Sequence, residues 1–402
     1  MTNGEAHVWS IFHHEVSKLS SVFSPVGYTD VEMQLAINDC IHSGGGTLCL
    51  DGAYTLEHTV NIGPIPASVF GTPRFAHMDI VCSSDTTITW GGAANTSMFY
   101  CLNWKRSQIS GGTIFAGNKS GVVVFDLDST FDACSLGGDL FSNVNIYLNG
   151  TNQIGYRLGV SQQNITPAQM AEGFAIGEAL GDISMITWLN CGVIGYNQSG
   201  TYGFLNYSDN TLNLDWVGGG YSGLNYGYSN KPPGWFGSGD VFFFGTGMSS
   251  NKVCFDFERT GSLSVFGGRF ENTGIFLNAG QSGGTWGQKI IVSGVTIDGN
   301  SSLQSPSIPV IQVNGVTQLK FDGIIYPLSQ GIGNPALIFN ENLAVVAAGI
   351  PGGVLDISGS VIGGDPTAGG FVTNNSSPNF HVYQDRIVCL GTSTNVSGVL
   401  NP

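Results

Sequence analysis

The stretch Ser264-Val-Phe-Gly-Gly-Arg-Phe270 contains a short alternating strand, a glycine corner and a second alternating strand. The same phrase returns at Ile291-Val-Ser-Gly-Val-Thr-Ile297 and at Lys320-Phe-Asp-Gly-Ile-Ile-Tyr326. Five further copies occupy Gln108–Ile114, Leu140–Ile146, Trp188–Ile194, Asp215–Tyr221 and Asp356–Ile362. The fourth residues of the later copies fall at 218, 267, 294, 323 and 359, and the longest gap, from 218 to 267, has room for two repeats. Repeats of this length predict a stacked, solenoid-like protein.

A second kind of strand lies between the copies of the phrase. It is more apolar and often ends in Asn or Asp, as in Val122–Asp128 and Pro309–Asn314. Two or three short strands per repeat, closed by Gly, Asn or Ser turns, describe one rung of a parallel β-helix. A rung buries one alternating face and pairs its backbone with the rungs above and below, so only a stack is stable. The predicted fold class is therefore all-β, a single-stranded parallel β-helix.

The composition agrees with this class and excludes others. The 402 residues include 60 glycines and only 10% charged residues, whereas 42% are hydrophobic and 11% aromatic. Disordered chains have few aromatics and many charges, collagen has glycine at every third residue, and glycine destabilises helices. The remaining class is a large β protein rich in turns, with a surface of Asn, Ser, Thr and Gly.

The net charge of -15 restricts the partners. Nucleic acid and anionic membranes both need a basic surface, so neither is expected as a partner. An anionic polysaccharide would be repelled unless Ca²⁺ bridges it or the few arginines gather in one groove. No apolar run is long enough to cross a membrane, and residues 1–20 lack the apolar core of a secretory signal. Most of the eight scattered cysteines sit in apolar segments and are expected to be buried free thiols.

The segment before the repeats has the features of a cap. Thr29 and Asp30 are N-cap residues, apolar side chains follow at near-helical spacing up to Ile41, and three glycines at 44–46 end the predicted helix. Val31, Met33, Leu35, Ile37 and Ile41 are the apolar side chains expected on its inner face. A strand at 47–50, a turn and a strand at 54–56 follow. A helix here would cover the open end of the stack, which otherwise recruits other chains.

Residues 29–62 resemble the entry motif of pectate-lyase-like right-handed β-helix proteins. The shared features are Ala36-Ile37 near the middle of the helix, the triple glycine, and Gly52-Ala53-Tyr54 after the turn, although Asp51 stands where the family often has proline. The family includes secreted pectin-cleaving enzymes and the trimeric tailspikes of bacteriophages, which bind and often cleave host surface polysaccharide. Because no export signal is expected, the resemblance favours a tailspike, assembled in the host cytoplasm, carried on the virion tail and acting outside the cell.

The resemblance implies a right-handed solenoid, a homotrimer and contacts with other tail proteins through the N-terminus. The expected organisation is a lead-in or particle-attachment segment (1–28), the capping helix and first rungs (29–100), the β-helix body (101–370) and a C-terminal tip or trimer-contact segment (371–402).

The candidate catalytic residues lie in the most charged part of the chain. Aligning Gly267 with Gly294 places Glu271 and Asp298 at matching positions of successive rungs, about 4.8 Å apart. Carboxyl groups ~5–5.5 Å apart suit a retaining glycosidase, and ~6.5–9.5 Å suits an inverting one. The wider candidate set adds four charged residues of the same stretch: Asp256, Glu258, Arg259 and Arg269. The alternatives are a solvated strand face, a salt-bridge patch between subunits, and a Ca²⁺ site; no other cofactor is expected.

An aromatic segment precedes these rungs. Four of its rings are the candidate substrate-binding residues, because aromatic rings stack on the flat faces of sugars: Tyr221, Tyr226, Tyr228 and Trp235. The alternative is packing inside the protein or between subunits. No histidine occurs between His77 and His381, which excludes a Ser-His-Asp triad from the central rungs.

The resemblance, taken with these residues, implies a tailspike that binds host surface polysaccharide. They lean toward a polysaccharide-degrading enzyme, without deciding between hydrolase and lyase. A free enzyme of the same fold and a non-catalytic adhesive β-helix remain the alternatives.

Overall fold

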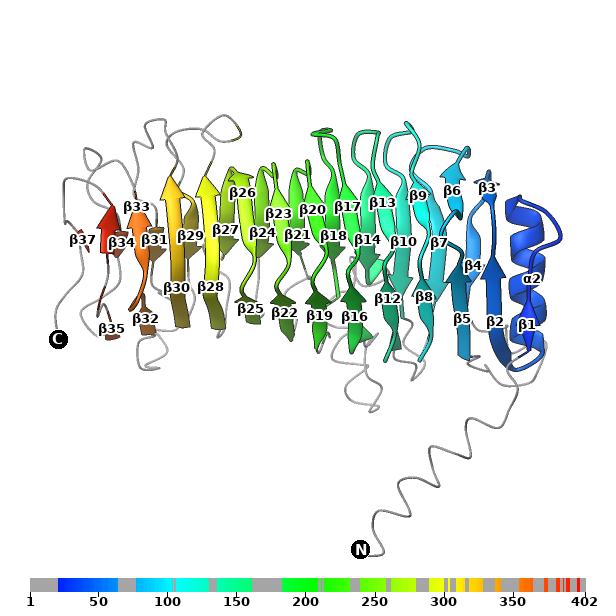
Figure 1. The fold of residues 1–402 in the computed structure, drawn as a ribbon, viewed down its shortest axis with the longest axis horizontal. Coiled ribbons are helices and arrows are strands. Elements are labelled where there is room, and N and C mark those ends of the chain that lie inside the picture. Colours follow the sequence, from blue (N-terminus) through cyan, green and yellow to red (C-terminus); the bar gives the residue numbers. More distant parts are fainter. Residues whose placement is uncertain are drawn as a thin grey trace, which may run out of the picture.

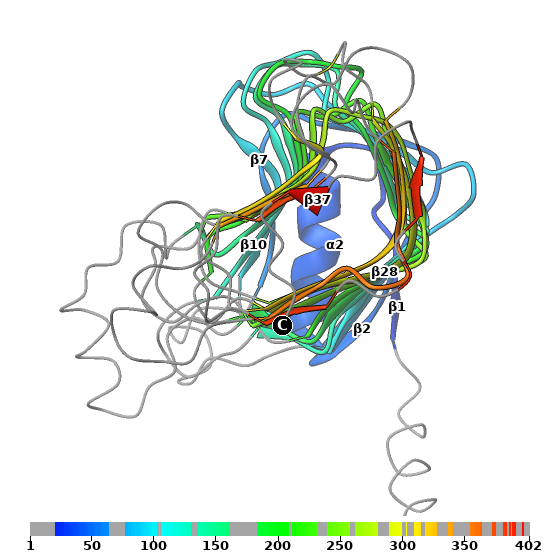
Figure 2. The same cartoon turned by 90° about the vertical axis from the view of Figure 1, so that its left-hand side faces the viewer.

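A computed structural model describes residues 21–63, 77–102, 104, 106–129, 136–160, 183–208, 211, 213–231, 239–257, 262–279, 289–299, 303, 309–314, 318–327, 337–340, 354–363, 372–374, 381–383, 386, 388–390 and 396–397. Its strands are stacked along one axis, with a single described helix, α2 (Asp30–His42), at the N-terminal end (Figure 1). The chain passes in turn through three parallel ladders, and we call one such pass a rung. Figure 2 shows the rungs end-on, arranged around a common axis. The architecture is all-β and consistent with a parallel β-helix.

Each ladder pairs equivalent strands of successive rungs in parallel register. Ladder 1 contains β1 (Val22–Phe23), β2 (Gly45–Leu50), β5 (His77–Cys82), β8 (Gln108–Ser110), β12 (Leu140–Ser142), β16 (Ile186–Leu189), β19 (Leu214–Val217), β22 (Asp240–Phe244), β25 (Ser262–Phe266), β32 (Val354–Asp356) and β35 (His381–Tyr383). Ladder 2 contains β3 (Ala53–Leu56), β6 (Thr87–Trp90), β9 (Thr113–Phe115), β13 (Asn145–Tyr147), β17 (Gly192–Ile194), β20 (Gly220–Ser222), β23 (Gly247–Ser249), β26 (Arg269–Thr273), β33 (Val361–Gly363) and β36 (Val388–Leu390). The long strands β28 (Lys289–Gly299) and β30 (Gln318–Pro327) belong to both ladders and join them into one sheet.

Ladder 3 is a separate sheet. It contains β4 (Val60–Ile62), β7 (Ser97–Leu102), β10 (Val123–Asp128), β14 (Ile154–Leu158), β18 (Tyr202–Asn206), β21 (Tyr226–Asn230), β24 (Val253–Phe257), β27 (Ile275–Ala279), β29 (Ile311–Asn314), β31 (Leu337–Asn340), β34 (Val372–Asn374) and β37 (Val396–Ser397). The short strands β11 (Leu136–Gly137) and β15 (Ile183–Ser184) pair outside the ladders.

The recurring phrase of the sequence is the passage from ladder 1 through a corner into ladder 2. At these corners Gly267 and Gly294 have φ of 67° and 66°, the left-handed region that glycine adopts without strain. Asn143 and Asn190 take the same conformation in earlier rungs. The long gap between copies holds one further rung, β22 and β23, with its corner at Gly245. The predicted repeat of strand, corner and strand is confirmed.

The interior is held together by two continuous stacks of aromatic rings. In ladder 1, Phe141, Trp188, Trp216 and Phe243 stack with centroid distances of 5.8, 4.4 and 4.5 Å. In ladder 3, Phe99, Phe125, Tyr156 and Phe204 stack at 5.1, 5.3 and 4.8 Å. The two stacks meet edge to face, as Phe204 does with Trp216 at 4.8 Å. Much of the aromatic content is therefore structural.

Helix α2 covers the N-terminal end of the stack, as predicted, but with a different inner face. Met33, Ile37 and Ile41 are buried as expected, whereas Val31 and Leu35 are 59% and 58% exposed. Ala36 and Cys40 take the buried positions instead, because they share the helix face of Met33 and Ile37 at spacings of three and four residues. The backbone N–H of Thr29 donates to Glu32 Oε2 at 3.1 Å, which starts the helix with a capping box.

Within the described residues, the cysteines are free and four of them are buried: Cys40, Cys101, Cys191 and Cys254. Burial raises the pKa of the Cys254 thiol to about 12, so it is unreactive at neutral pH. No helix in the described ranges is long and apolar enough to cross a bilayer.

The two ends of the chain bear on the expected organisation. Residues 1–20 of the lead-in segment lie outside the described residues, and its remainder includes β1, which pairs with β2. In the expected tip, β34 to β37 continue the three ladders in parallel register.

The aromatic stack makes a prediction about stability. Replacing the fully buried Trp216 by alanine leaves a cavity between Trp188 and Phe243, so we expect Trp216→Ala to lower the free energy of unfolding by about 3–5 kcal/mol. Phe244→Ala removes a ring that is 39% exposed and should cost about 1 kcal/mol or less. Chemical denaturation followed by tryptophan fluorescence and circular dichroism measures both. Equal effects of the two variants would contradict a core built on this stack.

Candidate functional site

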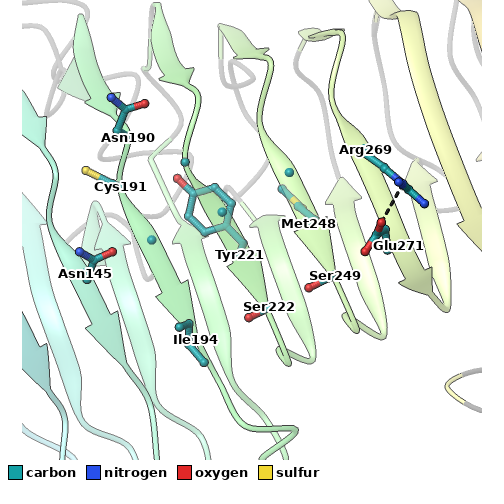
Figure 3. A pocket seen from close by; sticks show the side chains of 14 residues that line it. Asn145, Asn190, Cys191, Ile194, Tyr221, Ser222, Met248, Ser249, Arg269 and Glu271 are labelled. Carbon is teal, nitrogen blue, oxygen red and sulfur yellow. Dashed lines mark ion pairs between the residues drawn. The ribbon is translucent and has the colours of Figure 1, made fainter.

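An open groove of about 570 Å³ lies along the outer face of ladder 2. It extends over β13, β17, β20, β23 and β26, with Asn145 and Asn190 near one end and Arg269 and Glu271 at the other (Figure 3). The alternation of the strands decides which side chains reach it. In β26, for example, Phe270 is buried, whereas its neighbours Arg269 and Glu271 are on the outer face.

The floor of the groove is a column of glycines. Asn145 pairs with Gly192, Gly192 with Gly220, and Gly220 with Gly247. Rungs on either side place side chains in this column, such as Thr113 next to Asn145. Three successive rungs therefore lack an outward side chain at the same position, which hollows the surface.

Neither backbone conformation nor packing requires these glycines. Gly192, Gly220 and Gly247 do not have positive φ. A Cβ on Gly220 would meet only a carbonyl oxygen 3.9 Å away, and one on Gly247 would be 3.7 Å from its nearest neighbour, both ordinary contacts. At Gly192 the obstacle would be Asn145 Oδ1 at 2.8 Å, the end of a side chain that can rotate. The corner residue Gly219 differs, since its φ is 77° and its Cβ would collide with the carbonyl of Cys191.

One apolar and three polar side chains lie beside this floor. The neighbouring column of ladder 2 pairs Ile194 with Ser222, Ser222 with Ser249, and Ser249 with Glu271. The hydroxyl groups of the two serines can donate and accept, and Ile194 offers an apolar surface. The groove thus combines hydrogen-bonding groups with a flat backbone floor.

Arg269 joins two carboxylates at the C-terminal end of the groove. Its Nε lies 2.7 Å from Glu271 Oε1, and its Nη2 lies 3.3 Å from Asp298 Oδ2. The Arg269 and Glu271 side chains are 66% and 44% exposed, whereas that of Asp298 is 13% exposed. The guanidinium therefore lies at the end of the groove, largely exposed, and is ion-paired with both carboxylates.

The structure brings Glu271 and Asp298 together. Phe270 pairs with Ile297 in neighbouring strands, and both carboxylates follow that pair and contact the same guanidinium. The register shifts between Phe270 and Thr273, just after this point. Their catalytic role stays a prediction.

Asp256 lies elsewhere. It belongs to β24 of ladder 3, is 4% exposed, and accepts hydrogen bonds from Ser229 Oγ at 3.1 Å and Asn278 Nδ2 at 2.8 Å. It is not among the residues that line the groove. Glu258 and Arg259 lie outside the described residues.

The aromatic segment is corrected by the structure. Tyr221 and Tyr228 are 1% and 0% exposed and pack inside the rungs, because strand alternation turns them inward, so neither offers a ring face to a sugar. Tyr226 is half-buried on ladder 3, where its ring stacks on Tyr202 at 4.7 Å, away from the groove. Trp235 lies outside the described residues.

Sequence reasoning missed the glycine column and a set of partly or largely exposed rings beside it. A signal was present in the sequence, because Gly192, Gly220 and Gly247 each come one or two residues after the corner of their rung. It could be found only by aligning corners rung by rung, which the unequal loop lengths conceal. The rings are Phe115, Tyr147 and Tyr196.

The described residues do not fit a Ca²⁺ site. No group of three or more His, Cys, Asp or Glu side chains within those ranges could hold a metal ion. Glu271 and Asp298 are instead both ion-paired with Arg269. Calcium prefers six to eight oxygen ligands, which this pair cannot supply.

Comparisons with known proteins find distant likeness only. No family model matches the chain, and no curated protein matches it. Among solved structures, ORF18 of Geobacillus virus E2 is 12% identical with a TM-score of 0.36, over 97% of this chain and 63% of that one. The A-module of mannuronan C-5 epimerase AlgE6 from Azotobacter vinelandii is 11% identical (TM-score 0.39), over 92% and 97%. An exopolygalacturonase from Thermotoga maritima is 10% identical (TM-score 0.34), over 95% and 96%. The chain thus spans less than two thirds of the viral protein.

The glycine column predicts an uncommon response to mutation. Gly220→Thr gives this rung the residue that Thr113 and Thr296 supply elsewhere in the column, so the free energy of unfolding should stay unchanged or rise by up to about 1 kcal/mol. Gly219→Thr, one residue away, should be clearly destabilising because of its positive φ and the collision with Cys191. Thermal and chemical denaturation of the two variants test this. A large loss of stability in Gly220→Thr would mean that the fold itself needs this glycine.

Proposed function

We propose that this chain is a polysaccharide-binding protein whose rungs form a right-handed parallel β-helix, and that the saccharide lies in the groove of ladder 2. The observation that carries the proposal is the glycine column. Glycine inside a strand weakens the strand. Glycines at the same position of three successive rungs, which neither the backbone conformation nor the packing requires, are best explained by a ligand that needs the space.

The chemistry of the groove suits a sugar chain. A saccharide presents hydroxyl groups at its edges and C–H groups on its faces, so its site needs polar groups that fix orientation together with flat apolar surface. Asn145, Ser222 and Ser249 supply the first, and Ile194 and the glycine floor supply the second. The open, elongated shape admits a chain that continues beyond both ends.

The charge of the groove favours a neutral saccharide. Among its lining residues, Arg269 carries the positive charge, and it is shared by Glu271 and by Asp298 just outside the lining. This cluster therefore has a net charge of about -1, and the whole chain carries -15. A polyuronate would be repelled both at long range and on contact.

Binding is the primary activity and cleavage is the second candidate. Glu271 and Asp298 follow paired residues of neighbouring strands, which places two carboxyl groups at the end of the groove, as a glycosidase requires. However, the Arg269 guanidinium lies between them, where cleavage would need a water molecule or the glycosidic oxygen. In a binding site the same guanidinium, already oriented, donates to sugar hydroxyls.

The tailspike role rests on the resemblance of residues 29–62 to the entry motif of that family. It includes a homotrimer, attachment to a virion tail through the N-terminal segment, and recognition of a host surface polysaccharide outside the cell. A free polysaccharide lyase or hydrolase, or an adhesive β-helix, would use the same groove.

Binding is tested on an array of purified bacterial capsular and O-chain polysaccharides, neutral and uronate-containing. We expect retention on one or more neutral polysaccharides, and loss of binding by about tenfold or more in Gly220→Thr, whose side chain fills the floor. Trp-fluorescence unfolding of the same variant shows that it remains folded. Binding to uronate polymers alone, or unchanged binding by Gly220→Thr, would contradict the proposal.

Cleavage is tested by incubating the retained polysaccharide with the protein and measuring new reducing ends, and also the absorbance of unsaturated uronates where the polymer contains uronate. If cleavage occurs at this site, Glu271→Gln and Asp298→Asn should abolish it. Product formation that survives both substitutions would place catalysis elsewhere. Retained binding without products would identify a purely binding function.

A further inference from the structure

Three aromatic side chains continue the groove toward the N-terminal rungs. Phe115 and Tyr147 are paired residues of β9 and β13, and their rings stack with centroids 5.1 Å apart and planes 20° apart. Tyr196, just after β17, lies over Tyr147 at 6.3 Å and 29°. We call Phe115, Tyr147 and Tyr196 the aromatic shelf.

The shelf is continuous with the groove. Tyr147 is two residues beyond Asn145 on the same strand, and it pairs with Ile194 of the next rung, and both of these neighbours line the groove. Along the stack, the same column of ladder 2 leads from Phe115 and Tyr147 through Ile194, Ser222 and Ser249 to Glu271. Its five rung steps cover about 24 Å.

The backbone of Tyr196 has an energetically unfavourable conformation. Its φ is 48°, a left-handed conformation that is uncommon for a bulky side chain, and Asn197 follows with φ of 59°. The ring is 53% exposed, whereas the rings of the interior stacks are fully buried. The backbone is fixed there by Asn197 N–H, which donates to the carbonyl of Gly223 at 2.7 Å. Strained residues of this kind concentrate where a ligand is contacted.

We infer that the aromatic shelf is a stacking subsite for sugar rings of the saccharide bound in the groove, so that the chain runs along the stack of rungs and across the strands. This inference rests on the proposed function. The apolar face of a pyranose ring lies on the exposed ring of Tyr196, and the next sugar contacts the outer edge of Tyr147, whose ring faces stack against Phe115 and Tyr196. The middle of the saccharide lies over the glycine floor, and its far end reaches Arg269. The shelf contains no charged side chain, which agrees with a neutral saccharide.

Because the saccharide runs along the stack of rungs, the contribution of the shelf to affinity should depend on the length of the saccharide. A short fragment fits over the glycine floor alone, whereas a fragment approaching 24 Å reaches both the floor and the shelf. The shelf should therefore contribute to the affinity of long fragments and not of short ones.

The test uses oligosaccharides from partial acid hydrolysis of the neutral polysaccharide that the array retains most strongly, separated by length. Binding is measured by titration calorimetry with the full chain, Tyr147→Ala, Tyr196→Ala and Tyr196→Phe. We expect the two alanine variants to bind long fragments about tenfold more weakly and short fragments as the unmodified protein does, and Tyr196→Phe to retain most of the affinity because it keeps the ring. Tyr383→Ala, on β35 of ladder 1, is the matched control, since Tyr383 is 56% exposed.

The outcomes separate the two proposals. If long fragments bind, Gly220→Thr abolishes binding, and the alanine variants bind every length normally, then the groove is correct and the shelf is not a subsite. If the alanine variants lose short and long fragments equally, the rings act on the groove indirectly and the inference is wrong. If the unmodified protein binds no saccharide on the array, the proposed function fails, and the shelf fails with it.

Discussion

The parallel backbone pairing between successive rungs is the constraint on which the rest of this structure depends. Because each strand pairs in register with its equivalent one rung away, residues at equivalent positions form columns about 4.8 Å apart. A column repeats whatever chemistry its residues carry. Inward columns of rings become continuous stacks, as from Phe141 to Phe243, and these stacks make the rungs cohere. Outward columns determine the surface.

The groove is the outward counterpart of the aromatic stacks. It arises where one column loses its side chains for three rungs, between Asn145 on one side and Arg269 on the other. The backbone hydrogen bonds of ladder 2 continue through the floor, so the floor is rigid and its backbone N–H and C=O groups already have partners. A ligand there would meet a preorganised surface and lose little binding energy to ordering the protein. The ion-paired Arg269 and the stacked shelf rings are also fixed before binding.

More of the fold than of the candidate site could be predicted from the sequence. Corners with positive φ select Gly or Asn, so residues such as Gly267, Gly294 and Asn143 make the rung visible in the sequence. The same alignment of corners placed Glu271 beside Asp298. It did not show which tyrosines face outward, because corner geometry shifts the alternation, and Tyr221 and Tyr228 proved to be interior. Nor did it reveal the groove, which consists of absent side chains and becomes visible only when rungs separated by unequal loops are stacked.

The central claim is that a saccharide lies along ladder 2, over the glycine column and parallel to the axis of the stack. A crystal structure of the protein with the longest retained oligosaccharide tests it most directly. The account predicts sugar density that extends from Tyr196 over Gly192, Gly220 and Gly247 to Arg269. Sugar bound on ladder 1 or ladder 3, with the groove of ladder 2 holding only solvent, would contradict it.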